Sequence, residues 1–207
     1  MGDAAAAALY DAMLLDTLAR CEAASHTTST VTRLVVLGAP DTEDQEALRL
    51  RVRAPWTLRA QVGADLEARL CHATRTLFAE GHEAVILTGS DAPTLPVHEL
   101  VAALPWLLEG PRRVVLGPAW DGGYTLLAAS HAESRLFEGV AFSTSRTREE
   151  TLERARATGF ETRLLPTCRD VDERDDLAWM ERHLAARPED APHAARWFSE
   201  RAKETRG

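Results

Sequence analysis

The fold is decided by the stretch Val85-Ile-Leu-Thr-Gly-Ser-Asp-Ala-Pro93, in which a short apolar run ends at a glycine and a carboxylate follows. The same pattern occurs in Leu34-Val-Val-Leu37 before Gly38 and in Val114-Val-Leu116 before Gly117. Uninterrupted apolar runs of this length are typical of parallel strands that are covered on both faces. The sequence therefore predicts a buried sheet whose strands end in short loops.

Helical periodicity alternates with these runs along the chain. Helices are predicted over residues 3–21, 66–80, 97–108 and 148–158, and from residue 173 onward with a break at 188–192. Two further strands are predicted over residues 124–129 and 160–165. Such alternation predicts an α/β fold, a three-layer α/β/α sandwich with a mostly parallel sheet, whose ligands collect at the carboxyl ends of the strands. We expect one domain over residues 1–187 and a helical tail over 188–207.

The composition of the chain argues against several classes of binding partner and of protein. The chain has 207 residues and a formal net charge of -8, which argues against nucleic-acid binding because that needs a concentrated positive field. Its three cysteines are widely spaced and suggest neither a disulfide framework nor a zinc site. No stretch approaches the roughly 20 apolar residues of a membrane-spanning helix. We expect a soluble protein of the reducing cytoplasm.

Three segments place carboxylates where apolar runs stop. Asp91 follows the run at 85–88, Asp121-Gly-Gly-Tyr124 follows the run at 114–116, and Asp170-Val-Asp172 follows the strand predicted at 160–165. Hard cations such as Mg²⁺ or Mn²⁺ prefer carboxylate and phosphate oxygens. The two adjacent glycines also let a ligand approach the main chain closely. Together the segments outline an active site.

Each segment also has a structural interpretation. Asp91 or Ser90 would cap a turn, Asp121-Gly122 would form a hairpin turn, and Asp172 would cap the helix that begins near residue 173. Trp120 would stack on a ring, although a tryptophan beside a turn more often packs, and we expect packing. The serines at 143–145 lack the glycines of a nucleophile elbow, which argues against a hydrolase.

The order of these motifs resembles a bacterial group of GT-A-like glycosyltransferases, the radical-SAM/selenodomain-associated transferases. This group is related to the molybdenum-cofactor and phospholactate nucleotidyltransferases. The resemblance spans nearly the whole chain. It rests on Ala4–Leu18, Gln61–Leu66, Arg69-Leu70, Thr88–Pro93, Gly117–Tyr124, Phe142-Ser-Thr144 and Asp170-Val-Asp172.

The resemblance implies a nucleotide-diphospho-sugar transferase fold and a Mg²⁺ or Mn²⁺ cofactor. By the resemblance Asp91 and Asp172 would bind the metal, and Asp91 and Asp121 would be catalytic. The residues implied to bind substrate are Gln61, Gly63, Asp65, Gly122, Gly123, Tyr124, Ser143 and Thr144. The expected partner is a nucleotide sugar or a nucleotide, with neither nucleic acid nor a membrane involved.

The chain also departs from that family. Family members begin with an apolar strand and a phosphate-binding loop, whereas here Met1-Gly2-Asp3 leads directly into a helix. Ala92 replaces a common Cys, and Thr125 replaces a frequent Tyr. We therefore expect a sheet without its first strand, a weakened transfer activity, and an uncovered sheet position that would favour a homodimer. Glycosyl transfer, nucleotidyl transfer and non-catalytic binding all remain open functions.

Overall fold

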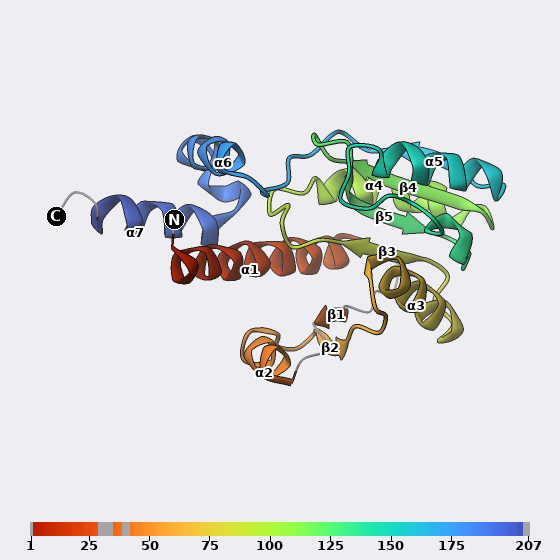
Figure 1. Cartoon of the computed structure of the whole chain (residues 1–207), viewed down its shortest axis with the longest axis horizontal. Helices are drawn as coiled ribbons and strands as arrows, with labels where there is room; N and C mark the ends of the chain where they lie inside the picture. The colour runs from red at the N-terminus through yellow and green to blue at the C-terminus, as the bar shows by residue number, and fades with distance from the viewer. Residues whose placement is uncertain (1, 29–34, 39–41, 205–207) are drawn as a thin grey trace.

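The computed structural model describes residues 2–28, 35–38 and 42–204. Helices and short strands alternate along these residues (Figure 1). The elements are α1 (Asp3–Thr27), β1 (Val35–Gly38), α2 (Thr42–Arg51), β2 (Thr57–Ala60), α3 (Leu66–Ala79), β3 (Val85–Thr88), α4 (Val97–Leu108), β4 (Arg113–Pro118), β5 (Tyr124–Ala129), η1 (Ser134–Leu136), α5 (Thr147–Ala157), β6 (Glu161–Leu164), α6 (Arg174–Ala186), η2 (Pro188–Asp190) and α7 (Pro192–Glu204).

The main sheet has four strands in the order β3-β5-β4-β6. β4 and β6 pair in parallel, whereas β5 runs antiparallel to both β3 and β4. The main sheet is therefore mixed, which corrects the expectation of a mostly parallel one. The reason is the tight turn over residues 119–123, which returns the chain directly beside β4 as a hairpin. β3, β4 and β6 still run in one direction, so their carboxyl ends share one edge.

Helices cover both faces of the main sheet, and the three-layer α/β/α sandwich is confirmed. On one face Leu107 of α4 packs with Val115. On the other face Ala155 of α5 packs with Val114, and α3 and η1 contribute to the same cluster. Because neighbouring residues of a strand point to opposite faces, the middle of β4 needs an apolar residue at every position, and residues 114–116 form a continuous apolar run.

A second sheet consists of β1 and β2, which pair in parallel beside α2. No element was predicted for residues 42–60, because α2 is largely charged and β2 is a short, half-exposed strand. In Figure 1 these elements lie apart from the main sheet. Among the described residues, β1 and β2 pair only with each other and with no strand of the main sheet.

The C-terminal helices pack on the N-terminal one. α7 and α6 gather around the first half of α1 in Figure 1, and Leu9 and Met13 share a cluster there with Met180 and Leu184. Asp16 of α1 is 1% exposed and accepts the N–H groups of His193 and Ala194 at the start of α7, each at 2.9 Å. The predicted tail is therefore bound tightly to the rest of the chain.

Within the described ranges, none of the helices combines the length and the apolar character that crossing a bilayer would require.

Candidate active site

Asp91 lies in the turn after β3, and its carboxylate folds back over Gly89. A Cβ atom on Gly89 would lie 2.5 Å from Oδ1 of Asp91, so glycine is needed for this approach. Helix α1 holds the same turn in place. The hydroxyls of Tyr10 and Ser90 lie 2.7 Å apart, and the Arg20 guanidinium donates to a main-chain carbonyl of the turn at 2.7 and 3.0 Å.

Asp121 opens the hairpin turn between β4 and β5. Its carboxylate accepts the N–H of Gly123 at 2.7 Å, so the hairpin interpretation of this motif is confirmed. Gly122 has a φ of +96°, and a Cβ there would collide with the main-chain carbonyl of Ser145. The N–H of Arg148, in the first turn of α5, donates to the Gly122 carbonyl at 3.0 Å. The turn is thereby locked against the start of α5, and Asp121 stays exposed at the sheet edge.

The segment after β6 brings the remaining carboxylates to this edge. Cys168 donates its N–H to the Pro118 carbonyl at 2.9 Å and forms a parallel bridge with Ala119. Three residues later Val171 donates its N–H to the Asp91 carbonyl at 3.0 Å. The segment therefore runs between the end of β4 and the Asp91 turn. Its hydrogen bonds carry Asp170 and Asp172 to the position where Asp121 and Asp91 already lie.

The resulting cluster fits a hard cation. Carboxylate oxygens of Asp121, Asp170 and Asp172 lie within 4.8 Å of one another. Oxygen ligands of one cation, each about 2.0–2.6 Å from it, are separated by at most about 5 Å. Of the two expected metal ligands, Asp172 belongs to this group, whereas Asp91 lies alongside it and Asp170 joins it. The sequence motif had named Asp170, but the resemblance singled out only Asp172.

The electrostatics of the cluster show like charges held together. Burial, and after it the charges of Asp121, Asp172 and Asp91, raise the pKa of Asp170 to about 6. The pKa values of Asp91 and Asp172 are also raised, first by burial and then by neighbouring aspartates. Carboxylates that repel one another in this way gain most from a shared cation, because it neutralises all of them at once.

Asp172 does not cap helix α6. The N-cap residue is Glu173, and its N–H donates to the carboxylate of Asp176 at 2.9 Å. The N–H of Asp172 donates to the same carboxylate at 3.3 Å. Capping is thus performed by Glu173 and Asp176 in a reciprocal capping box, and the pKa of Asp176 is lowered by these bonds and by Arg169. The alternative role for Asp172 is removed, and its carboxylate belongs to the cluster.

Three of the residues implied to bind substrate lie around the start of α3. Asp65 is its N-cap and accepts the Ala68 N–H at 2.8 Å. Gln61 donates to the Leu37 carbonyl at 3.1 Å, and Gly63 packs tightly against the main chain of Arg69. In the described part of the chain no hydrogen bond links them to the four aspartates. Their contacts are those of a helix start beside β1, and their role in binding stays a prediction.

The other implied residues lie under and beside the Asp121 turn. Tyr124 is part of the core, with its hydroxyl buried near Thr151, and burial raises its pKa to about 12. Thr144 donates to the Ala141 carbonyl at 2.7 Å and accepts the N–H of Arg146 at 3.2 Å, so it organises the approach to α5. Ser143 is exposed in a left-handed conformation with φ of 60°. Ser143 and Thr144 are both exposed, whereas Tyr124 is largely buried.

The exposure of Trp120 differs from the prediction made from the sequence. We expected this ring to pack, but it is 70% exposed, beside Asp121. The guanidinium of Arg169 lies over the ring, 5.5 Å from its centroid. The sequence gives no signal for this exposure, because it depends on how the hairpin turn meets the segment after β6.

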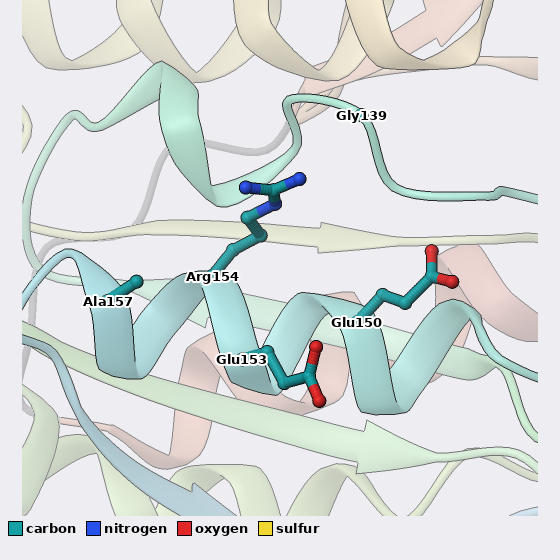
Figure 2. A pocket seen from close by; sticks show the side chains of 5 residues that line it. All are labelled: Gly139, Glu150, Glu153, Arg154 and Ala157. Carbon is teal, nitrogen blue, oxygen red and sulfur yellow. The ribbon is translucent and has the colours of Figure 1, made fainter.

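A separate surface hollow of about 450 Å³ lies along α5 (Figure 2). Its lining includes Glu150, Glu153 and Arg154 from the helix, with Gly139 opposite them, and none of the four aspartates. Glu150 is already engaged, since its carboxylate accepts the Ala141 N–H at 2.7 Å. The hollow is therefore not the candidate site.

Comparisons with known proteins agree with this fold. The crystal structure of a "putative nucleotide-diphospho-sugar transferase" from Desulfovibrio desulfuricans G20 is 26% identical, with a TM-score of 0.78 over 95% of this chain and 88% of that one. A cytidylyltransferase from Leptospira borgpetersenii serovar Hardjo-bovis (strain JB197) is 14% identical, with a TM-score of 0.55 over 84% of this chain and 76% of that one. The second likeness shows the fold alone. None of the curated proteins matches the chain significantly.

A protein family accounts for most of the chain. The family described as "Uncharacterized protein conserved in bacteria (DUF2064)" matches residues 19–144. The match includes the turns that carry Asp91 and Asp121, and it agrees with the resemblance that the motifs indicated. The chain therefore belongs to this bacterial family of uncharacterized proteins, DUF2064.

Proposed function

We propose that the protein is a metal-dependent transferase that moves a sugar from a nucleotide-diphosphate donor to an acceptor hydroxyl. The observation that carries this proposal is the convergence of Asp121, Asp170 and Asp172 within 4.8 Å at the carboxyl edge of the sheet. The fold shared with a nucleotide-diphospho-sugar transferase supports the same conclusion. A metal site at this edge suits a ligand that carries two phosphates.

The four aspartates have two kinds of role in this proposal: three would bind the metal, and one would act as the base. Asp121, Asp170 and Asp172 would hold Mg²⁺ or Mn²⁺, which would neutralise the charge that develops on the departing diphosphate. Asp91, beside this group, would accept the proton of the acceptor hydroxyl. That oxygen then forms a bond to the anomeric carbon, and the bond from this carbon to the phosphate oxygen breaks. The diphosphate leaves with the electron pair.

The test compares matched aspartate variants. With radiolabelled nucleotide sugars and Mn²⁺, the wild-type protein should release nucleoside diphosphate. Asp170→Asn and Asp172→Asn should lower this release at least about 100-fold, as expected when a charge that acts in the transition state is removed. Asp175→Asn, three residues from Asp172 on the exposed start of α6, is the control and should retain full activity. Equal activity in all four proteins would refute the role of the cluster.

A second function is nucleotidyl transfer, favoured by the fold shared with a cytidylyltransferase. The same cation would then activate a nucleoside triphosphate, and the product would be pyrophosphate instead of nucleoside diphosphate. Product analysis with labelled donors therefore distinguishes the two reactions. A non-catalytic binding protein would release neither product, and Mn²⁺ would not raise its Tm with any nucleotide.

A further inference from the structure

The exposed aromatic residues of the described chain gather at the aspartate cluster. Tyr10 and Trp120 are the aromatic members of the set of large apolar side chains left exposed, at 50% and 70%. Tyr10 is hydrogen-bonded to Ser90, the neighbour of Asp91, and Trp120 is the neighbour of Asp121. Exposed aromatic surface beside a cluster of carboxylates is an apolar surface that is available for a ligand to cover.

The guanidinium of Arg169 supports the Trp120 ring. The bridge between Ala119 and Cys168 puts Trp120 opposite Arg169, whose guanidinium lies 5.5 Å from the Trp120 ring centroid and 5.3 Å from that of Trp179. Asp176 fixes this guanidinium through two contacts of 2.8 Å. Because the arginine is clamped by α6, the indole is presented as a supported surface at the rim of the site.

The chemistry of this rim suits a sugar ring. A hexose has an apolar face of C–H groups, which stacks on an indole, and an edge of hydroxyls, which donate hydrogen bonds to carboxylates. Trp120 supplies the surface on which that apolar face would stack. Because Trp120 is the sequence neighbour of Asp121, a sugar stacked on the indole would lie beside a diphosphate held at the aspartates.

We propose that Trp120 is the stacking platform for the hexose of the nucleotide-sugar donor, and that Arg169 is the positioning residue that supports it. The assignment rests on the proposed function, since it places the sugar beside diphosphate bound at the aspartates. It adds a specificity determinant: the tryptophan binds the sugar, and the aspartates bind the diphosphate through the cation.

Calorimetry with Mn²⁺ separates these two parts of the donor. The probes are UDP and GDP, and with them UDP-glucose and GDP-mannose. Trp120→Ala should leave the Kd of the diphosphates within about twofold and weaken binding of their sugar nucleotides about tenfold, the usual loss when a stacked ring is truncated. Trp120→Phe should recover most of the loss, because phenylalanine keeps a flat face. Arg169→Lys should give an intermediate loss, since lysine cannot stack between two rings.

The matched control is Trp197→Ala on α7, because the Trp197 ring also has an arginine guanidinium over it, at 5.3 Å. Trp197→Ala should change neither the Kd of the diphosphates nor the Kd of the sugar nucleotides. If UDP and GDP fail to bind the wild-type protein, the proposed function fails, and this assignment with it. If they bind and Trp120→Ala weakens both kinds of probe equally, the ring contacts the nucleotide base and the sugar assignment is wrong. If Trp120→Ala weakens neither, Trp120 has no part in donor binding.

Discussion

At the scale of single residues, the position of the Asp91 carboxylate depends on the missing side chain at Gly89. The backbone of Gly89 does not have a positive φ, so alanine fits there without backbone strain. Its Cβ would lie 2.5 Å from Oδ1 of Asp91, and the carboxylate would have to rotate away. Gly89→Ala should therefore keep the Tm within about 2 °C and reduce transferase activity at least about tenfold. Unfolding monitored by circular dichroism, together with product release, checks both parts.

The control for this variant is Gly122→Ala. At Gly122, in contrast to Gly89, φ is positive and the new Cβ would meet backbone instead of a side chain. Gly122 has a φ of +96°, and its new Cβ would meet backbone, the Ser145 carbonyl, which cannot move aside easily. Here the expected result is a loss of about 1–3 kcal/mol of stability. A Gly89→Ala enzyme with wild-type activity would show that the carboxylate of Asp91 does not act in the reaction.

At the scale of secondary structure, helix α7 is capped by a residue from another helix. Asp16 of α1 accepts the N–H groups of His193 and Ala194 while buried. Asp16→Ala would leave two buried donors unsatisfied and should cost about 2 kcal/mol, or roughly 4–8 °C in Tm. Asp16→Asn keeps one acceptor oxygen and should lose about half as much. Equal Tm values for the three proteins would mean that α7 is held by its apolar contacts alone.

The elements also show what a sequence can predict. The helix over 97–108 and the strand over 124–129 were predicted at their observed bounds, because each has a clear apolar pattern and a glycine or proline beside it. The direction of β5 was left open: the Asp121-Gly122 hairpin predicted an antiparallel strand, but continuous apolar runs look alike in parallel and antiparallel strands. α2 and β2 were missed because they lack an apolar pattern.

Some residues of the candidate site could also be predicted from the sequence, and others could not. Asp91, Asp121 and Asp172 were predictable because each follows an apolar run, and strand ends meet at one edge of a sheet. The capping roles of Asp65 and Asp176 follow from hydrogen bonds to residues three positions away in the sequence, whereas the exposure of Trp120 depends on how its turn meets the distant segment that carries Arg169. A local sequence pattern does not record that long-range contact, so the structure was needed to find the exposed ring.

At the scale of the whole molecule, the aspartate cluster makes the stability depend on pH, and the proposed metal site predicts a dependence on Mn²⁺ as well. The pKa of Asp170 is raised to about 6 from 3.8. Its folded form therefore holds a proton more strongly than the unfolded chain does. The contribution to stability is complete below about pH 4 and is lost as the pH rises through about 6. A cation reverses this loss, because it stabilises the ionised cluster in the folded state only.

Mn²⁺ should therefore raise the Tm more at pH 7 than at pH 5, by a few degrees for a chain of this length. Asp170→Asn removes the group and one repulsive charge, so the variant should be more stable than the wild-type protein at pH 7 without metal and should respond less to Mn²⁺. Glu133, whose pKa is lowered to about 2, titrates outside this window and does not obscure the comparison. Calorimetric scans of both proteins at pH 5 and pH 7 measure the difference. An identical response to Mn²⁺ at the two pH values in both proteins would show that the cation does not bind at these aspartates.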